Sequence, residues 1–307
     1  MEIEKFNEIK KILENSGLFY KKNNVFVDKT AEDYSKNFEL QWAEFPLTQF
    51  DSTSGFPLTK NRLLESSNWV FSQLENKLII ELGSGAGRFT EIFKLSNCFL
   101  VSVEMSNAVF VNAKNNNSDR IIFIKSSLNN LKFLNLFFDY VFCYGVAQHT
   151  PDILNTYKSL YNFAKLGGKI SIDHYLKLKY PTTKDIWRPI STRIKPSILL
   201  KIIKFYIPFY FPIDTFIKTK TPFLISKLLR CVLPIPCVNY SNEKDIPQEK
   251  EKLIEWAIMD TFDALGAKYD KPLYPNEMKK IAIQIGLNKY KIKKRLNFLI
   301  LNGERNS

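Results

Sequence analysis

The chain has 307 residues, of which 45% are hydrophobic and 14% aromatic, and it carries a formal net charge of +13. This apolar content excludes an intrinsically disordered chain, and the length allows one large domain or two small ones. About twelve Lys and Arg residues but only two acids, Asp185 and Asp214, lie between positions 177 and 230, so the rest of the chain is nearly neutral.

The first residues, MEIEKFNEIK, are charged and lack the apolar core of a signal peptide. No uncharged apolar run approaches the roughly 18 residues that a membrane-spanning helix needs. The cysteines are scattered and indicate no disulfide framework, and a chain with two histidines is expected to have no metal site. We therefore expect a cytoplasmic protein.

From about Lys77 onward, short apolar runs alternate with helical patterns. We predict strands over 78–82, 99–104, 121–124, 138–144 and 169–174, with helices over 88–96, 106–115 and from Pro151 to the glycines at 167 and 168. Strands that alternate with helices form a parallel sheet with helices on both faces.

The alternation stops after Tyr175, and up to about Lys271 the chain is rich in proline, aromatic residues and lysine. A predicted helix over 275–285 follows, and then two strand-like runs over 289–295 and 297–301. These two runs are too close for a helical crossover, so they should form an antiparallel hairpin. We predict a doubly wound, mostly parallel, Rossmann-like α/β sheet of seven strands, with a helical insertion before the last helix.

The segment LIIELGSGAGRFTEIF, residues 78–93, places Gly83, Gly85 and Gly87 at the end of a predicted strand. In doubly wound sheets, ligands bind beyond the carboxyl ends of the strands, and glycine lets a ligand approach the backbone closely. Glu104 ends the next strand, 17 residues beyond Gly87. A carboxylate there can accept hydrogen bonds from both hydroxyls of a ribose.

A dinucleotide-binding loop is the first alternative, but it needs the pattern G-x-G-x-x-G, and Arg88 occupies the position of its third glycine. Glu81 also precedes the loop. A carboxylate is unfavourable near two phosphates and favourable near an ammonium group. S-adenosylmethionine has an ammonium, a sulfonium and a ribose but no phosphate, so it fits this loop better.

The segment ELGSGAGRF resembles motif I of the class I S-adenosylmethionine-dependent methyltransferases, and VSVEMS, FDYVFCYGVAQHTPD and LGGKISIDHY resemble their later strand segments. The stretches at 41–52 and 260–272 look like flanking motifs of a methyltransferase type 11/12-like subfamily that is often linked to surface-glycan and small-molecule modification. The likeness covers about 38–301 except for the basic insertion. It implies a methyltransferase with S-adenosylmethionine as its cofactor.

The resemblance also implies which residues hold the cofactor: Glu81, the three loop glycines and Glu104. One position departs from the family, which usually has an acid just after the third strand that contacts the adenine amino group. Ser127 stands there instead. Serine still accepts a hydrogen bond, and the backbone of Leu128 can contribute to the same contact.

His149 follows the fourth strand, where residues of this family that face the substrate often lie. Histidine can take a proton from an attacking hydroxyl, so His149 is the candidate catalytic base. The alternative is that His149 only positions its loop or caps the next helix. His174 and Tyr175, after the fifth strand, are candidates for orienting the acceptor.

The flanking motifs supply four further candidates that can cover the site, namely Trp42, Gln49, Asp263 and Tyr269. The alternative is that these residues belong to connecting loops held by their own hydrogen bonds. The domains expected are an N-terminal extension or cover (1–50), the cofactor-binding core (51–175), the basic apolar insertion (176–271), and the last helix and hairpin (272–307).

In the insertion, lysines beside bulky apolar residues suit an anionic membrane surface, with 177–230 as the contact. A helical lid with solvated lysines is an equal alternative. Nucleic acid is less favoured, because the segment is very apolar and no Asn/Asp-Pro-Pro-aromatic motif follows the fourth strand.

We therefore expect methyl transfer, with O-methylation favoured, to a small molecule or to a glycan or lipid-linked precursor. The enzyme would be cytoplasmic or peripheral to the membrane. Two alternatives stay open: an RNA or protein methyltransferase, and a non-catalytic module of the same fold that binds a membrane or a partner.

Overall fold

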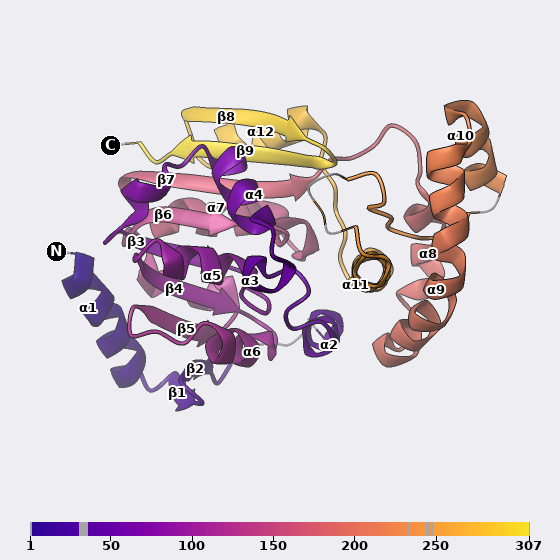
Figure 1. Ribbon diagram of the computed structural model, residues 1–307. Helices are drawn as coiled ribbons and strands as arrows, with labels where there is room; N and C mark the ends of the chain where they lie inside the picture. The colour runs from indigo at the N-terminus through magenta and orange to yellow at the C-terminus, as the bar shows by residue number, and fades with distance from the viewer. Residues whose placement is uncertain (1, 31–35, 233, 244–245, 247, 307) are drawn as a thin grey trace. The chain divides into compact units, whose positions relative to one another are not determined.

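Figure 1 shows a computed structural model of the chain, which describes residues 2–30, 36–232, 234–243, 246 and 248–306. The chain divides into two compact units. The first unit comprises Met1–Tyr34, Thr59–Lys177 and Tyr269–Ser307, and the second comprises Ser35–Leu58 and Leu178–Lys268. Each unit has a core of its own.

The first unit is built on a nine-stranded sheet in the order β1-β2-β5-β4-β3-β6-β7-β9-β8. Its central strands, from β2 to β7, are parallel, whereas β1 and β9 run antiparallel to their neighbours. The strands are β1 (Phe19–Lys22), β2 (Val25–Asp28), β3 (Leu78–Leu82), β4 (Phe99–Glu104), β5 (Ile121–Lys125), β6 (Phe138–Cys143), β7 (Ala164–Tyr175), β8 (Lys289–Arg295) and β9 (Phe298–Glu304).

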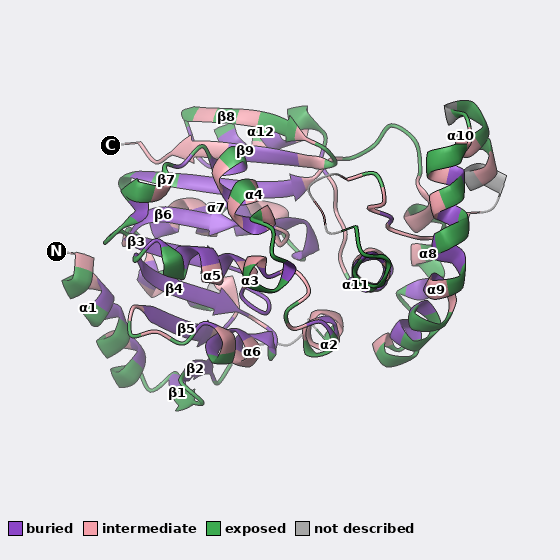
Figure 2. Ribbon diagram, viewed as in Figure 1, coloured by how far each residue is buried: buried purple, intermediate pink, exposed green. Residues whose placement is uncertain are grey.

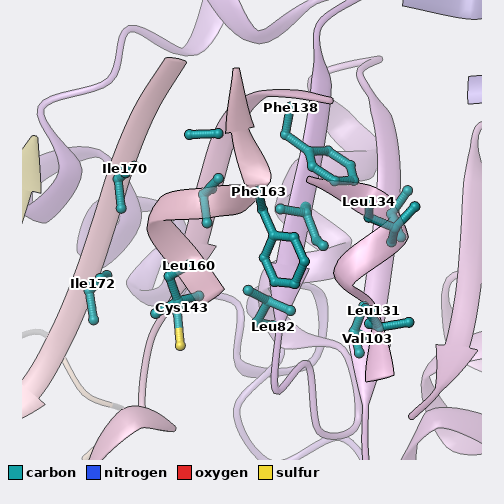
Figure 3. Packing of buried hydrophobic residues seen from close by; sticks show 14 of the residues in the cluster. Leu82, Val103, Leu131, Leu134, Phe138, Cys143, Leu160, Phe163, Ile170 and Ile172 are labelled. Carbon is teal, nitrogen blue, oxygen red and sulfur yellow. The ribbon is translucent and has the colours of Figure 1, made fainter. Parts of the chain in front are cut away.

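Helices cover both faces of this sheet, because the buried strands carry apolar side chains on each face. One face packs against α1 (Glu2–Asn15), α7 (Ile153–Phe163) and α12 (Pro275–Gln284). The other packs against α4 (Leu58–Ser67), α5 (Arg88–Leu95) and α6 (Ala108–Asn115). Figure 3 shows part of the first core, where Phe138 of β6 lies near Phe163 of α7.

The predicted fold class is confirmed, including the antiparallel hairpin at the C-terminal end. Strands β3, β4 and β8 have the bounds predicted from the sequence. Two strands, β1 and β2, were not predicted, and they extend the sheet beyond β5. Figure 2 shows that the central strands are buried, whereas β1 and β8 at the two edges are largely exposed.

Several predicted helix bounds were wrong. Helix α6 begins at Ala108 instead of Ser106, and α7 ends at Phe163, before the glycines at 167 and 168. Helix α7 begins at Ile153 instead of Pro151, and its N-cap is Asp152, whose side chain accepts a hydrogen bond of 3.0 Å from the backbone N–H of Asn155. The hydroxyl of Thr150, which directly precedes the predicted start, donates to the carbonyl oxygen of Ala147, at 2.8 Å. Thr150 therefore stabilises the turn that carries His149.

The second unit is helical. Its core lies mainly between α9 and α11, where apolar residues such as Ile203 and Phe262 are completely buried. The helices of this unit are α2 (Lys36–Glu44), α3 (Asp51–Ser54), α8 (Thr183–Ser191), α9 (Pro196–Lys220), α10 (Phe223–Val232) and α11 (Lys250–Gly266). Part of the predicted N-terminal cover and most of the predicted insertion therefore share one core.

Candidate functional site

The glycine loop connects β3 to α5. Gly83, Gly85 and Gly87 have φ values of +70°, +55° and +99°, a left-handed region that side chains disfavour. A Cβ atom on Gly83 would collide with Val146, and one on Gly87 would collide with Asn112 of α6. The loop therefore needs glycine for its conformation and, at these two positions, also for close packing.

Glu104 ends β4 beside this loop. Its Oε2 accepts a hydrogen bond of 3.1 Å from the backbone N–H of Gly85, and its Oε1 accepts one of 2.8 Å from that of Ser106. The backbone thus fixes the orientation of the carboxylate. Each oxygen has a second lone pair, so the carboxylate can still accept a hydrogen bond from a ribose hydroxyl.

Glu81 lies in β3, just before the loop, and is only 1% exposed. Its Oε2 accepts a hydrogen bond of 2.5 Å from Thr90, but its buried Oε1 has no hydrogen-bond partner among the described residues. Burial raises the pKa of Glu81 to about 7, although hydrogen bonds from Thr90 and Ser102 oppose this rise. An ammonium group would satisfy Oε1 and favour the charged carboxylate, so this site fits the amino group of S-adenosylmethionine.

Asn112 of α6 and Asn116, the residue that follows this helix, tie the helix to the loop. Asn112 donates to the hydroxyls of Thr90 and Ser102, at 2.9 and 3.0 Å. Asn116 donates to the carbonyl oxygen of Gly87, at 2.9 Å. This buried network was not predicted from the sequence. It could have been recognised because Asn112 and Asn116 are four positions apart, so that both fall on the same face of a helix.

Ser127 and Leu128 lie at the carboxyl end of β5, where Ser127 precedes the short 3-10 helix η2 (Leu128–Asn130). Asp28, at the end of β2, organises this turn. It accepts hydrogen bonds of 2.7 Å from the hydroxyl of Ser126 and of 2.8 Å from the amide of Asn130. Asp28 was not among the predicted site residues, because no strand was predicted at the position of β2.

His149 lies in the turn after β6. Its Nδ1 is 2.8 Å from the carbonyl oxygen of Tyr269, which is 120 residues away in the sequence. A carbonyl can only accept a hydrogen bond, so Nδ1 carries the proton and the lone pair of the neutral ring lies on Nε2. The ring also contacts Tyr175 edge to face, with centroids 5.4 Å apart.

His174 is completely buried, and both of its ring nitrogens are engaged. Nε2 donates to the carbonyl oxygen of Lys271, at 2.8 Å, and Nδ1 lies 3.3 Å from the hydroxyl of Tyr157. Burial lowers the pKa of His174 to about 4, so the ring is neutral near pH 7. Both ring nitrogens of His174 therefore contact groups of the first unit.

Several polar residues that the sequence analysis did not select also lie at this edge of the sheet. Asp173 of β7 is 1% exposed and pairs with Arg62 of α4, with Oδ2 and Nη2 2.5 Å apart. Gln148, next to His149, is completely buried, and neither polar atom of its side chain has a hydrogen-bond partner among the described residues. Such an amide can bind a polar group of an acceptor.

The candidates from the flanking motifs fall into different units. Tyr269 belongs to the first unit, and its carbonyl contacts His149. Asp263 lies inside α11 of the second unit rather than in a loop. Trp42 of α2 packs against the core of the second unit, and Gln49 lies between α2 and α3.

Comparison with known proteins identifies the chemistry of the first unit. Residues 80–172 match the family model described as a methyltransferase domain. The matched region contains the glycine loop, Glu104 and His149. This match confirms the expectation of a methyltransferase that uses S-adenosylmethionine as its cofactor. A search of curated proteins found no match.

Several solved structures are similar to the chain. One is a proposed S-adenosyl-L-methionine-dependent methyltransferase from Methanococcus maripaludis, with 14% identity, 91% coverage of this chain, 97% coverage of that chain and a TM-score of 0.47. An S-adenosylmethionine-dependent methyltransferase from Aquifex aeolicus has 12% identity, coverages of 89% and 99%, and a TM-score of 0.44. Magnesium protoporphyrin IX methyltransferase from Synechocystis, with bound S-adenosylhomocysteine, has 10% identity, coverages of 91% and 90%, and a TM-score of 0.43.

Proposed function

We propose that this methyltransferase methylates a hydroxyl oxygen of a small molecule or of a glycan precursor, with His149 as the base. The observation that carries the proposal is the hydrogen bond from Nδ1 of His149 to the carbonyl oxygen of Tyr269. It fixes the tautomer in which Nε2 can accept a proton. A hydroxyl needs such a base, because its proton must leave as the new bond to carbon forms.

The cofactor would be held by the glycine loop, with Glu81 facing the ammonium group and Glu104 accepting from the ribose. When bound, S-adenosylmethionine supplies an electrophilic methyl group. The turn at Ser127 and Leu128 would contact the adenine. The rigid backbone of the loop holds these groups in place, which lowers the entropy that is lost when donor and acceptor align.

His149 would receive the acceptor proton on Nε2. The Tyr269 carbonyl oxygen then accepts from Nδ1 of the resulting imidazolium and stabilises its charge. The buried amide of the neighbouring Gln148 would bind a second polar group of the acceptor. A glycan or polyhydroxylated small molecule offers hydroxyls for both residues.

Cofactor binding is tested by calorimetric titration with S-adenosylhomocysteine, with NAD as the control ligand. We expect the wild type to bind the first ligand alone, and Glu104→Ala to bind it at least about tenfold more weakly, because a charge-assisted hydrogen bond is lost. A folded wild type that binds NAD instead would contradict the proposed use of the loop.

The acceptor is sought by incubating the wild type with S-adenosylmethionine that carries a labelled methyl group and with fractionated extracts of the cells that make the protein. Mass spectrometry then identifies the labelled product. We expect an O-methyl group in the small-molecule, glycan or lipid fraction. Label in RNA or protein, or on nitrogen, would contradict the proposal and favour one of the alternatives.

The role of His149 is tested by two variants. In His149→Asn, the side-chain amide can still donate to Tyr269 and so keep the turn in place, but it cannot act as a base. We expect this variant to lose about 100- to 10,000-fold in kcat while binding S-adenosylhomocysteine normally. If His149 only positions the turn, His149→Asn will retain transfer and only His149→Ala will lose it.

A further inference from the structure

Helix α9 exposes a continuous apolar face. The face consists of six residues whose exposed fractions range from 46% to 75%, namely Ile198, Ile202, Phe205, Phe209, Ile213 and Phe216. At 100° per residue, these positions lie within an arc of about 80° along the whole helix. Single exposed apolar residues are ordinary, but a stripe of this length marks a contact surface.

The opposite side of α9 is already occupied. Leu199, Ile203 and Ile207 are buried in the core of the second unit, which also contains residues of α11. The helix is therefore apolar on two sides. By length and hydropathy it could cross a membrane, but 33% of its most apolar window is buried inside the chain. This burial suits a helix that lies on a membrane surface better than one that spans it.

Helix α10 adds to the exposed apolar area. Leu224 and Leu228 lie four residues apart on one side of this helix, and they are 77% and 63% exposed. Figure 2 shows exposed residues that alternate with buried and intermediate ones along α9, as expected for a helix with one exposed side. We call Leu224, Leu228 and the six residues of α9 the apolar stripe.

The exposed charges on α9 itself are all positive. Lys201 and Lys220 of α9 are exposed. Lys204 instead pairs with Glu44, and Lys218 donates to the carbonyl oxygen of Asn239. The only acid of α9, Asp214, is 1% exposed and accepts a hydrogen bond from Asn239.

We propose that the apolar stripe docks the protein on an anionic lipid bilayer, with α9 in the plane of the surface. Phe and Ile side chains would enter the boundary between headgroups and acyl chains, while Lys201 and Lys220 contact anionic headgroups. A second copy of this chain would oppose lysines with lysines in a symmetric contact. Nucleic acid would leave the apolar centre of the stripe without a partner.

This proposal stands apart from the proposed methyl transfer, because it concerns a surface of the second unit alone. If both hold, a lipid-linked acceptor becomes the natural substrate. A failure of one is distinguishable from a failure of the other, because vesicle binding is measured without cofactor or acceptor.

The test is flotation of the full chain at low salt with phosphatidylcholine vesicles, with and without phosphatidylglycerol. We expect binding only to the anionic vesicles. The double variant Phe205→Ser with Phe209→Ser should weaken it about tenfold. The double variant Lys201→Glu with Lys220→Glu should weaken it at least about thirtyfold.

Matched controls change equally exposed residues of the first unit. Leu95→Ser with Leu166→Ser replaces leucines that are 67% and 62% exposed, and Lys289→Glu with Lys291→Glu reverses two exposed charges of β8. Both controls should bind like the wild type, and melting curves should show that every variant is folded.

Three results would overturn the proposal. The first is a wild type that does not float with anionic vesicles, and the second is a set of stripe variants that bind as well as the controls do. The third is a dimer of the wild type in analytical ultracentrifugation that Phe205→Ser converts to a monomer, which would assign the stripe to a second copy of the chain.

Discussion

The carboxylate of Asp28 accepts a 2.7 Å hydrogen bond from the hydroxyl of Ser126, which lies 98 residues further along the chain. Strand β2 pairs in parallel with β5, so the two residues meet at the carboxyl edge of the sheet. Asp28, from the neighbouring strand, thus supports the turn after β5. In the class I methyltransferases that the sequence resembles, this turn usually carries an acid itself, whereas here Ser127 stands at that position. Asp28 holds this turn in place rather than replacing the missing contact.

We predict that Asp28→Ala binds S-adenosylhomocysteine about tenfold more weakly, because the turn at Ser127 loses the hydrogen bonds that fix it. Calorimetric titration measures this loss. The matched control, Asp119→Ala, removes an exposed acid and should leave the affinity unchanged. Equal affinities for both variants would contradict a role for Asp28 in ordering the turn.

Asp28 should also make stability depend on pH. Burial alone would raise its pKa, but hydrogen bonds from Ser126, Asn130 and Thr30 outweigh burial and lower it. The stabilisation is therefore present above the unfolded-state pKa of about 4 and is lost as the pH falls through the lower, folded-state value. Urea unfolding of the wild type should show this acid loss, and Asp28→Asn should show less of it.

Glu81 should have the opposite effect on stability. Its folded-state pKa of about 7 lies above its ordinary value of 4.5, so its contribution to stability is greatest below pH 4.5 and is lost as the pH rises through 7. Glu81→Gln should remove this fall and be more stable than the wild type at pH 8, by on the order of 2–3 kcal/mol. Glu14→Gln, an exposed substitution, should change nothing.

The same ionisation should control the affinity for the cofactor. If the charged carboxylate of Glu81 binds the ammonium group, S-adenosylhomocysteine will bind more tightly as the pH rises from 6 to 8, and Glu81→Gln will abolish this rise. Titrations across this range are the measurement. A wild-type affinity that does not change with pH would exclude Glu81 from direct contact with the ammonium group.

Gly87→Ala should cost more stability than the positive φ of this position alone explains. The new Cβ atom would collide with Asn112 and Asn116 and displace the network behind the loop. Gly17→Ala is the matched control, since Gly17 also has a positive φ but nothing within 4 Å of an added Cβ. We expect a cost of about 1–2 kcal/mol for the control and a larger cost, with loss of S-adenosylhomocysteine binding, for Gly87→Ala.

Arg62→Met should destabilise the first unit by about 3–5 kcal/mol, because it leaves the carboxylate of Asp173 buried without its cation. Arg295→Met breaks the exposed pair with Glu65, whose atoms are 2.9 Å apart, and should cost at most about 1 kcal/mol. Denaturant unfolding of both variants measures the difference. Equal costs would show that the pair of Arg62 and Asp173 is effectively solvated.

The sequence alone determined the central strands, the glycine loop and the cofactor. Each of these depends on residues that are close in the chain: an apolar run, glycines at fixed spacing, and an acid at the end of the next strand. Local backbone preference and hydrophobic burial are sufficient to define such features. The residues that match the methyltransferase family model, 80–172, include the glycine loop and Glu104.

Only the tertiary structure shows which contacts the individual polar residues make. His149 and His174 look alike in the sequence and are both buried, but Nδ1 of His149 contacts the carbonyl oxygen of Tyr269, whereas His174 contacts the hydroxyl of Tyr157 and the carbonyl oxygen of Lys271. Asp28 acquired its role because β2 pairs with β5. Such contacts join residues about 100 positions apart, and no local pattern encodes them because they form only when the sheet assembles.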